Sequence, residues 1–425
     1  MPNGIAAARN IADLQLLARK ALPGPVWNYL EGGADDEVTK RRNTAIFDDV
    51  LLTPEILTDV SNIDTRISML NIDFGFPVIM SPTGMSQLFH PSGEMAVARA
   101  AADHAVPYAL STMATTTIEE VAQIGGRRFF QLYCFKDRRL TSELLDRAKA
   151  SGYDGIILTA DTPVSGNRER DLVSGMSVPM KFPLKSLIDF SLHPKWSLPM
   201  LFGKRVALAN MTGGHWGTGS AAGVIAMVNG QMDRSITWKD LDWLRATWNG
   251  SLILKGVSAP IDAVEAAKIG CDGLMISNHG GRQLDGAVTP LEQLPHIRDA
   301  VGDAVVLILD GGVRRGTHIL KALALGADAC AIGRPYIFGL AAGGPAGVHR
   351  ALQILRTEFE RGMALLGVRC VADIRSRHVR WSGQQAATDF AVRLERNAWP
   401  NRPETSDNGP WTAVGRSAFS PGKAV

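Results

Sequence analysis

Eight short apolar runs recur through the middle of the chain, and a segment of helical character follows each one. The runs span residues 77–81, 107–111, 129–133, 156–160, 252–255, 274–277, 305–310 and 329–333. They lack polar alternation, which is typical of parallel strands buried on both faces. Most runs begin 20 to 35 residues after the previous one, which one strand and one crossover helix fill. Eight such units close a barrel, so we predict an α/β fold, a (β/α)8 TIM barrel.

The segments outside the barrel strands complete the predicted organisation. Residues 1–71 form an N-terminal helical cap, in which residues 10–22 read as a helix ended by Pro23. The barrel itself spans residues 72–382. More than ninety residues separate the fourth and fifth runs, so a long insertion follows strand 4 on the face that carries barrel active sites. Residues 383–425 are polar and form a loosely ordered C-terminal tail.

The insertion, residues 174–235, mixes apolar and aromatic side chains with more basic than acidic ones. From the residues alone, a lid or an oligomer contact packed against the barrel is the favoured interpretation. Contact with an anionic membrane surface is the alternative.

Composition excludes several classes of protein. Lys and Arg number 45 against 42 Asp and Glu, a net charge of +3 without a basic run, so nucleic acid is not expected as a partner. The four cysteines lie far apart, which argues against a disulfide framework and a zinc ribbon, and we predict no metal site. No apolar stretch approaches the roughly 18 residues of a membrane span and no signal peptide is recognisable, so we expect a cytoplasmic protein.

The run 277–285, Ser-Asn-His-Gly-Gly-Arg-Gln-Leu-Asp, begins where the sixth strand ends. His279 titrates near neutral pH, and Arg282 can hold a carboxylate with two hydrogen bonds. The alternative is a purely structural role, in which these residues form a surface turn with a hydrogen-bonded histidine. The position at a strand end favours a catalytic role.

Glycines make up 43 of the 425 residues and cluster after the last two strands. Asp310, Gly311, Gly312 and Arg314 follow strand 7, and Gly333 with Arg334 follows strand 8. In such barrels these two loops often bind phosphate through backbone N–H groups and the N-terminus of a short helix. We therefore predict a phosphate site there. The alternative is a pair of tight turns whose arginines are solvated.

Further polar side chains close strands 3 to 5. Asp161 could orient His279 and stabilise its charge, and Lys255 could hold a fixed positive charge against an electron-accepting ring. Each residue taken alone is equally consistent with a structural ion pair or a buried hydrogen bond. The group consists of Gln131, Tyr133, Thr159, Asp161, Arg168 and Lys255.

Together these stretches resemble the FMN-dependent L-2-hydroxy acid oxidase and dehydrogenase family, which includes glycolate oxidase, bacterial L-lactate dehydrogenase and (S)-mandelate dehydrogenase. The resemblance covers roughly residues 14–372. Its strongest segments are residues 29–34, 82–85, 130–133, 277–285, 321–327 and 333–335.

The resemblance implies FMN at the mouth of the barrel. The phosphate would lie near Asp310, Gly311, Gly312, Arg314, Gly333 and Arg334, and the flavin and ribityl chain near Thr83, Gly84, Ser111, Gln131, Thr159 and Lys255. It also implies that Arg168, Arg282 and Tyr29 hold the substrate carboxylate and that Tyr133 hydrogen-bonds the hydroxyl oxygen. His279 would remove a proton while Asp161 stabilises the imidazolium. Whether that proton comes from the hydroxyl, with hydride transfer, or from the α-carbon stays open.

Two positions and the insertion bear on substrate and electron acceptor. Met113 stands where glycolate oxidases carry a large Trp, and Gly84 resembles the dehydrogenases more than the oxidases. The insertion resembles that of the membrane-associating dehydrogenases, which puts peripheral membrane contact at the inner face of the cell membrane ahead of a lid.

We therefore expect a homo-oligomer, in this family a tetramer, that oxidises L-lactate or an aryl analogue such as mandelate to the 2-keto acid. Electrons would pass to a quinone or another acceptor. One alternative is an oxidase that forms H2O2 from O2. An alternative of another class is a non-catalytic barrel that binds a phosphate-bearing ligand.

Overall fold

The eight predicted runs are all strands, and they pair in parallel to close a barrel in the order β10-β11-β4-β5-β6-β7-β8-β9. The computed structural model describes residues 4–176, 182–203, 206–211 and 230–382. The predicted (β/α)8 fold is therefore confirmed. The strands are β4 (Val78–Met80), β5 (Tyr108–Ser111), β6 (Arg128–Leu132), β7 (Gly155–Thr159), β8 (Ser251–Val257), β9 (Gly273–Ser277), β10 (Val306–Asp310) and β11 (Ala329–Ile332).

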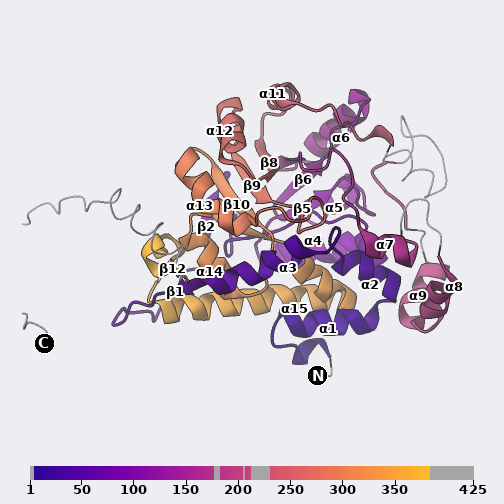
Figure 1. Ribbon diagram of the computed structural model, residues 1–425, viewed down its shortest axis with the longest axis horizontal. Helices are drawn as coiled ribbons and strands as arrows, with labels where there is room; N and C mark the ends of the chain where they lie inside the picture. The colour runs from indigo at the N-terminus through magenta and orange to yellow at the C-terminus, as the bar shows by residue number, and fades with distance from the viewer. Residues whose placement is uncertain (1–3, 177–181, 204–205, 212–229, 383–425) are drawn as a thin grey trace, which may run out of the picture. The chain divides into compact units, whose positions relative to one another are not determined.

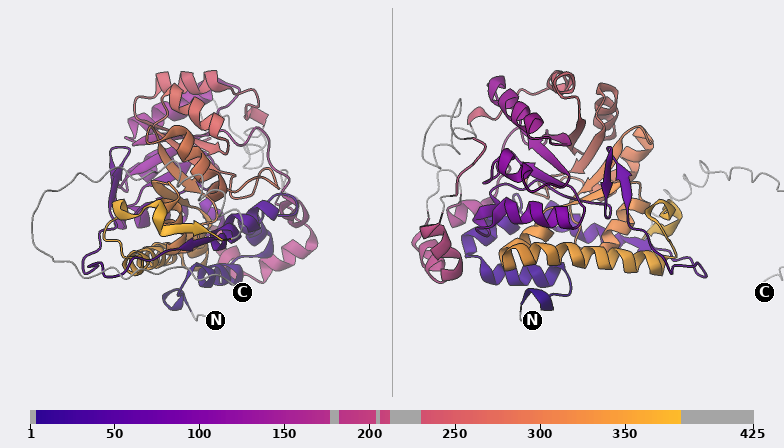
Figure 2. Two further views of the ribbon diagram at one scale, coloured as in Figure 1. Left: turned by 60° about the vertical axis from the view of Figure 1, so that its left-hand side comes forward. Right: turned by 180° about the vertical axis from the view of Figure 1, so that it is seen from behind.

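One helix after each strand covers the outside of the barrel (Figures 1 and 2). Local sequence explains where these helices start: Thr117 and Thr289 cap two of them through reciprocal capping boxes, which satisfy backbone N–H groups at the first turn. The helices are α4 (Gly93–Asp103), α5 (Ile118–Ala122), α6 (Arg138–Ala150), α11 (Trp238–Thr247), α12 (Pro260–Ile269), α13 (Pro290–Val301), α14 (Gly316–Ala324) and α15 (Arg334–Leu366).

The barrel interior is a packed core. Each strand contributes one buried apolar side chain to it: Ile79, Ala109, Phe129, Ile157, Ile253, Met275, Ile308 and Ala331. Ile72 and Phe74 join this cluster from β3 (Ile72–Phe74), which pairs with β2 (Ile67–Met69). Since Ser251, the first residue of β8, donates to the Leu70 carbonyl at 3.5 Å, this hairpin lies at the amino ends of the strands. The opposite end of the barrel is left for a site.

The N-terminal cap packs against the last helix of the barrel. α1 (Ile11–Ala21) begins after Asn10, whose side chain accepts from the Asp13 N–H at 2.9 Å, so the helix predicted over residues 10–22 is confirmed. It lies along α15, which bends at Gly343 and Gly344. Before α1 the cap contains η1 (Ile5–Ala7), and after α1 it contains α2 (Gly24–Glu31), α3 (Val38–Ala45), η2 (Ile46–Asp49) and β1 (Val50–Leu52). The chain after α15 forms the short helices η5 (Val371–Asp373) and η6 (Ser376–His378) and the strand β12 (Val379–Trp381), which pairs with β1.

Cap and barrel, up to Ser382, form one compact unit, and the division at residue 71 stays a prediction. The predicted tail, residues 383–425, lies outside the described residues. So do residues 177–181, 204–205 and 212–229 of the insertion. No helix in the described part of the chain is both long enough and apolar enough to cross a bilayer.

The insertion after β7 does follow strand 4 of the barrel, as predicted. Its described part includes α7 (Glu169–Ser174), α8 (Leu184–Ser191) and α9 (Pro194–Phe202), with α8 and α9 side by side at the edge of the molecule (Figure 1). Trp196 anchors α9, because its ring N–H donates to the Leu88 carbonyl at 2.8 Å and its ring stacks on Phe190. Asp189 on α8 accepts from the Gly24 N–H of α2.

Candidate active site

A cavity of about 840 Å³ opens at the carboxyl ends of the barrel strands. Every barrel strand contributes to its wall, by its last residues or by the loop that follows. Of the predicted site residues, all but Asp161 line it: Tyr29, Thr83, Gly84, Ser111, Met113, Gln131, Tyr133, Thr159, Arg168, Lys255, His279, Arg282, Asp310, Gly311, Gly312, Arg314, Gly333 and Arg334. Residues spread over more than three hundred positions therefore converge on one space.

His279 and Asp161 form a hydrogen-bonded pair at this cavity. Nδ1 of His279 lies 3.0 Å from Oδ1 of Asp161, which stands behind the ring as an orienting group. Burial lowers the pKa of His279 below its usual 6.5, although Asp161 acts in the opposite direction. The imidazole is thus neutral near pH 7 and can accept a proton at Nε2. His279 also has a φ of 58°, a left-handed conformation that is uncommon outside glycine and clusters at functional sites.

Lys255 supplies a buried positive charge between two carboxylates. Its Nζ lies 3.3 Å from Oδ2 of Asp310 and 3.8 Å from Oδ2 of Asp161, and it donates to Oγ of Ser277 at 3.0 Å. Burial opposes the charge on Lys255, but the two carboxylates outweigh it and raise the pKa of the ammonium. Burial likewise disfavours the charge on Asp161, yet Lys255 and His279 lower the pKa of that carboxyl to about 2. Lys255 and Asp161 therefore carry fixed, opposite charges at the cavity.

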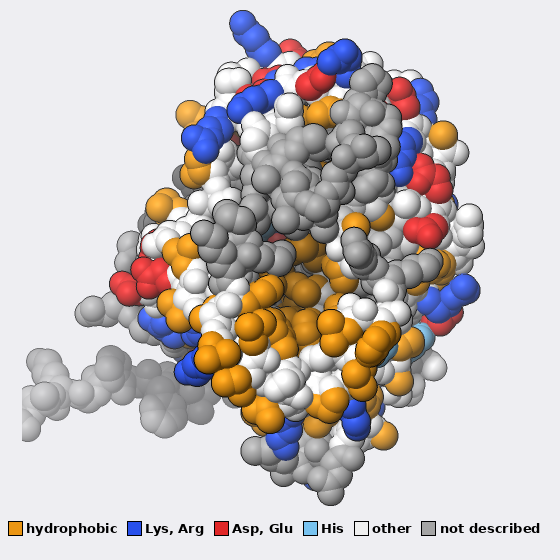
Figure 3. All heavy atoms as spheres, turned by 90° about the vertical axis from the view of Figure 1, so that its right-hand side faces the viewer, with side chains coloured by type: hydrophobic (Ala, Val, Ile, Leu, Met, Phe, Trp, Pro, Cys, Tyr) orange, Lys and Arg blue, Asp and Glu red, His pale blue; other side chains and the backbone are white. Residues whose placement is uncertain are grey.

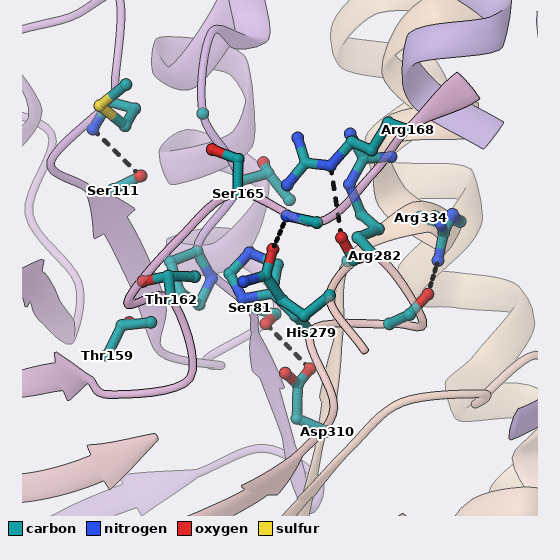
Figure 4. Close-up of a pocket in the computed structure, with 18 of the residues that line it drawn as sticks. Ser81, Ser111, Thr159, Thr162, Ser165, Arg168, His279, Arg282, Asp310 and Arg334 are labelled. Atoms are coloured by element: carbon teal, nitrogen blue, oxygen red, sulfur yellow. Dashed lines mark hydrogen bonds between the residues drawn. The ribbon is translucent and has the colours of Figure 1, made fainter. Parts of the chain in front are cut away.

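Arg282 and Arg168 lie beside each other above His279 (Figure 4). One guanidinium nitrogen of Arg282 donates to the carbonyls of Tyr29 and Gly32 at 2.8 and 2.9 Å, and the group lies over the Tyr29 ring. Burial, followed by the neighbouring Arg168 and Arg334, lowers the pKa of Arg282. Positive charge is thus concentrated here, which favours binding of an anionic group.

Arg314 and Arg334 form a second basic pair, on the side of the glycine-rich loops. Arg334 donates to the backbone carbonyls of Leu30, Gly32 and Gly280 at 2.9 to 3.2 Å. Burial and then Arg334 lower the pKa of Arg314 to about 10. Positive charge is therefore concentrated on this side of the cavity as well.

At the start of α14, one backbone N–H group already has a carboxylate partner within the chain. The Gly316 N–H at the start of α14 donates to Oε2 of Glu358 at 2.9 Å, and Arg315 pairs with the same carboxylate at 2.8 Å. An anion at residues 311–314 would instead face the loop backbone, the two arginines and the start of α15 at Gly333. The phosphate position at this loop stays a prediction.

The wall of the cavity fits a flavin. Nε2 of Gln131 and Oγ1 of Thr159 are buried without a hydrogen-bond partner among the described residues, and unpaired buried polar atoms of this kind are costly unless a ligand engages them. At Gly84 a Cβ would lie 2.9 Å from Cβ of Met113, so this edge of the wall has no room for a side chain.

The sequence did not reveal several residues of the wall. Ser81 donates to Oδ1 of Asp310 at 3.0 Å, and its place at the end of the first run could have identified it. Asp171, one helical turn after Arg168, is 7% exposed and lines the cavity. An apolar part of the wall is formed by Met85, Phe89, Met113, Met176 and Met232, for which the sequence carried no signal beyond Met113.

This geometry defines an acid–base site combined with a cofactor-sized anion site on a TIM barrel. Residues 18–381 match the model of the FMN-dependent dehydrogenase family. A putative L-lactate dehydrogenase of Mycobacterium tuberculosis is 40% identical over 378 residues, 88% of this chain and 90% of that protein. Glycolate oxidase 5 of Oryza sativa subsp. japonica is 40% identical over 371 residues, 87% of this chain and 95% of that protein.

Among solved structures, that of a monotopic membrane protein, (S)-mandelate dehydrogenase, superposes with a TM-score of 0.85 at 36% identity, over 88% of this chain and all of that one. The chain belongs to the FMN-dependent 2-hydroxy acid oxidase and dehydrogenase family. It is an FMN-dependent 2-hydroxy acid oxidoreductase with FMN as its cofactor. The non-catalytic phosphate-binding barrel is thereby excluded.

Proposed function

We propose that the enzyme oxidises L-lactate or an aryl analogue such as mandelate to the 2-keto acid and passes the electrons to a quinone or another acceptor. The observation that carries this proposal is the neutral His279, held by Asp161 at 3.0 Å and facing the same cavity as Arg168 and Arg282. A base and a carboxylate clamp in one cavity suit a small 2-hydroxy acid.

In this mechanism Arg168 and Arg282 bind the substrate carboxylate with help from Tyr29. Burial raises the pKa of Tyr133 to about 12, so its phenol stays protonated and donates to the substrate hydroxyl oxygen. His279 removes a proton at Nε2, since Nδ1 is engaged by Asp161, and the carboxylate stabilises the imidazolium that results.

FMN supplies the two-electron acceptor when it is bound. Its ring and ribityl chain would be held by Thr83, Gly84, Ser111, Gln131, Thr159 and Lys255, with Lys255 as a fixed cation beside the ring. Its phosphate would lie near Asp310, Gly311, Gly312, Arg314, Gly333 and Arg334, where the arginines supply positive charge and Asp310 positions Lys255 and Ser81.

The substrate side chain would contact the apolar wall at Met85, Phe89 and Met113. Thioethers are flexible and adapt to groups of different size, which supports an aliphatic or an aryl substituent. The test is anaerobic reduction of the bound flavin by a panel of glycolate, L-lactate, L-2-hydroxybutyrate and (S)-mandelate. Faster reduction by glycolate than by every larger acid would contradict this assignment.

The acceptor is tested by mixing the reduced enzyme with O2 or with a soluble quinone. We expect quinone to reoxidise it faster. The relatives named glycolate oxidase give the oxidase alternative its support, and rapid reoxidation by O2 with stoichiometric H2O2 would establish that alternative instead.

The α8–α9 surface is proposed to rest on the inner face of the cell membrane. Hydrophobic side chains gather on this face of the molecule (Figure 3), and Leu201 and Phe202 at the end of α9 are 74% and 83% exposed. The other exposed members are Leu184, Leu187, Ile188, Leu192 and Leu198, with Lys185 and Lys195 beside them. Apolar residues bordered by lysines suit an anionic bilayer.

Sedimentation with liposomes containing 30% phosphatidylglycerol tests this surface. Leu201→Ser/Phe202→Ser should lose most of the bound fraction, whereas Ile56→Ser/Leu57→Ser, a control at an exposed apolar pair outside the insertion, should keep it. Equal binding by both double variants would refute the membrane role. The homotetramer is a separate proposal, and a monomer or dimer mass in sedimentation equilibrium would contradict it.

A further inference from the structure

His318 lies directly beneath the glycine-rich loop that follows β10. It is the third residue of α14 and is only 7% exposed. Its ring stacks on Phe47 of the N-terminal cap, with ring centroids 4.1 Å apart and planes 11° apart. A buried imidazole is therefore sandwiched between the cap and the loop, outside the set of residues that the reaction uses.

The ring makes a defined polar contact with the loop. The backbone N–H of Arg314 donates to Nδ1 of His318, at 3.3 Å. The other ring nitrogen then carries the proton, and a hydrogen bond with the backbone of Gly312 acts on the ring as well. Burial, followed by the charge of Lys321, lowers the pKa of His318 to about 3, so the ring is a neutral acceptor and donor at any working pH.

The same loop is closely packed against the cap at Gly312. Gly312 has a φ of 78°, and a Cβ there would lie 1.8 Å from the Asn43 carbonyl oxygen. Gly312 thus packs directly against Asn43, while His318 holds the Arg314 amide of the same loop. Because the Arg314 amide is engaged by the ring, the peptide plane that carries the Arg314 side chain is fixed before any ligand arrives.

We propose that His318 is a positioning residue that presets the 311–314 loop for a phosphate monoester and thereby lets the site favour FMN over riboflavin. The proposal rests on the phosphate position given above. His318 touches neither substrate nor flavin in this scheme and acts through Gly312 and Arg314. When the loop is already ordered, less of the binding free energy is lost in ordering it. The effect of His318 on affinity should therefore be confined to ligands that carry the phosphate.

The test compares flavin binding to the full-length protein after removal of FMN. His318→Phe keeps an aromatic ring on Phe47 but loses both polar contacts, whereas His318→Gln retains an acceptor and a donor. An unsatisfied buried amide costs about 1–3 kcal/mol, which is roughly 5- to 150-fold in affinity. Fluorescence titration should show a loss in that range for FMN with His318→Phe, an unchanged riboflavin affinity, and near wild-type values for His318→Gln.

Arg314→Gln tests the phosphate position separately from the role of His318. If Arg314→Gln lowers FMN affinity relative to riboflavin and His318→Phe does not, the role of His318 is wrong while the phosphate position stands. If Arg314→Gln leaves the FMN to riboflavin ratio unchanged, the phosphate position is wrong and the role of His318 is overturned with it. Equal loss of FMN and riboflavin binding in His318→Phe also overturns it, since that indicates general damage.

A second measurement does not depend on the folding of a variant. Amide hydrogen exchange of the wild-type peptide covering residues 311–315 should be slow with FMN and remain slow after FMN is removed. Exchange at the rate of an unstructured loop in the flavin-free protein would show that the loop is ordered by the cofactor, and the proposal would be overturned.

Discussion

Replacing Asp161 by Asn should slow the proton-transfer step and leave binding largely intact. Asp161 lies 3.0 Å from the ring nitrogen of His279 and 3.8 Å from Nζ of Lys255. Two unit charges about 4 Å apart interact by about 4 kcal/mol at an effective dielectric constant near 20. Asn keeps the shape and loses that interaction with the imidazolium. At 1.36 kcal/mol for each factor of ten, we expect flavin reduction to slow by roughly a thousandfold.

The structure indicates what should stay unchanged in Asp161→Asn. Lys255 retains Asp310 at 3.3 Å, so its charge and the flavin environment persist. The assay is anaerobic stopped-flow reduction of the bound flavin at saturating substrate, with the flavin spectrum as a check on occupancy. Asp171→Asn is the matched control, because Asp171 is a second buried carboxylate of the cavity wall but faces Arg168 and Arg282.

Three outcomes decide this prediction. A thousandfold slower reduction in Asp161→Asn, with the control within about tenfold of wild type, supports the orienting role. Slowing of less than tenfold with FMN still bound would refute it. Equal slowing in both variants would mean that any negative charge near the cavity serves, and the specific pairing with His279 would be wrong.

The remaining predictions concern the clamp, the base and the loop. Arg282→Lys should raise KM and lower kcat, since a point charge replaces a planar group that also donates to Tyr29 and Gly32; unchanged steady-state kinetics would place the substrate carboxylate elsewhere. Because burial lowers the pKa of His279 and Asp161 raises it, kcat/KM should fall as pH drops through a value below 6.5. This acid limb should move to lower pH in Asp161→Asn, and an acid limb at the same pH in both proteins would argue against His279 as the base. Gly312→Ala should release FMN and lower the melting temperature, because its Cβ would lie 1.8 Å from the Asn43 oxygen at a φ of 78°; full flavin content after purification would contradict that packing.

The barrel was predictable because its strands are buried on both faces. The stretch 156–158 is apolar throughout, and eight runs of this kind at similar spacing leave few other folds. The same logic located His279 and Lys255, since residues at the carboxyl ends of parallel strands meet at one rim. Their pairing with Asp161 could be expected only as a possibility, as spacing in sequence does not fix a distance of 3.0 Å.

Contacts between segments far apart in the chain could not be predicted from the sequence. Glu358 accepts from the first N–H of α14 although it lies 42 residues further along the chain, and nothing in residues 311–316 predicts this contact. The stacking of His318 on Phe47 joins the barrel to the cap across 271 positions. Such pairs depend on how the cap docks, which is set by tertiary packing and not by periodicity.

The insertion has two roles in the structure, and this constrains how its proposed membrane contact can be tested. Met176 and Met232 line the cavity from within the predicted insertion, while Leu201 and Phe202 are exposed on its outer face. Trp196 and Asp189 tie the α8–α9 pair to the barrel and the cap. Deleting the segment would remove these anchors and disturb the cavity wall together with the apolar surface. Substitutions confined to the exposed side chains change the outer face alone, so loss of liposome binding with normal flavin reduction would separate membrane contact from catalysis.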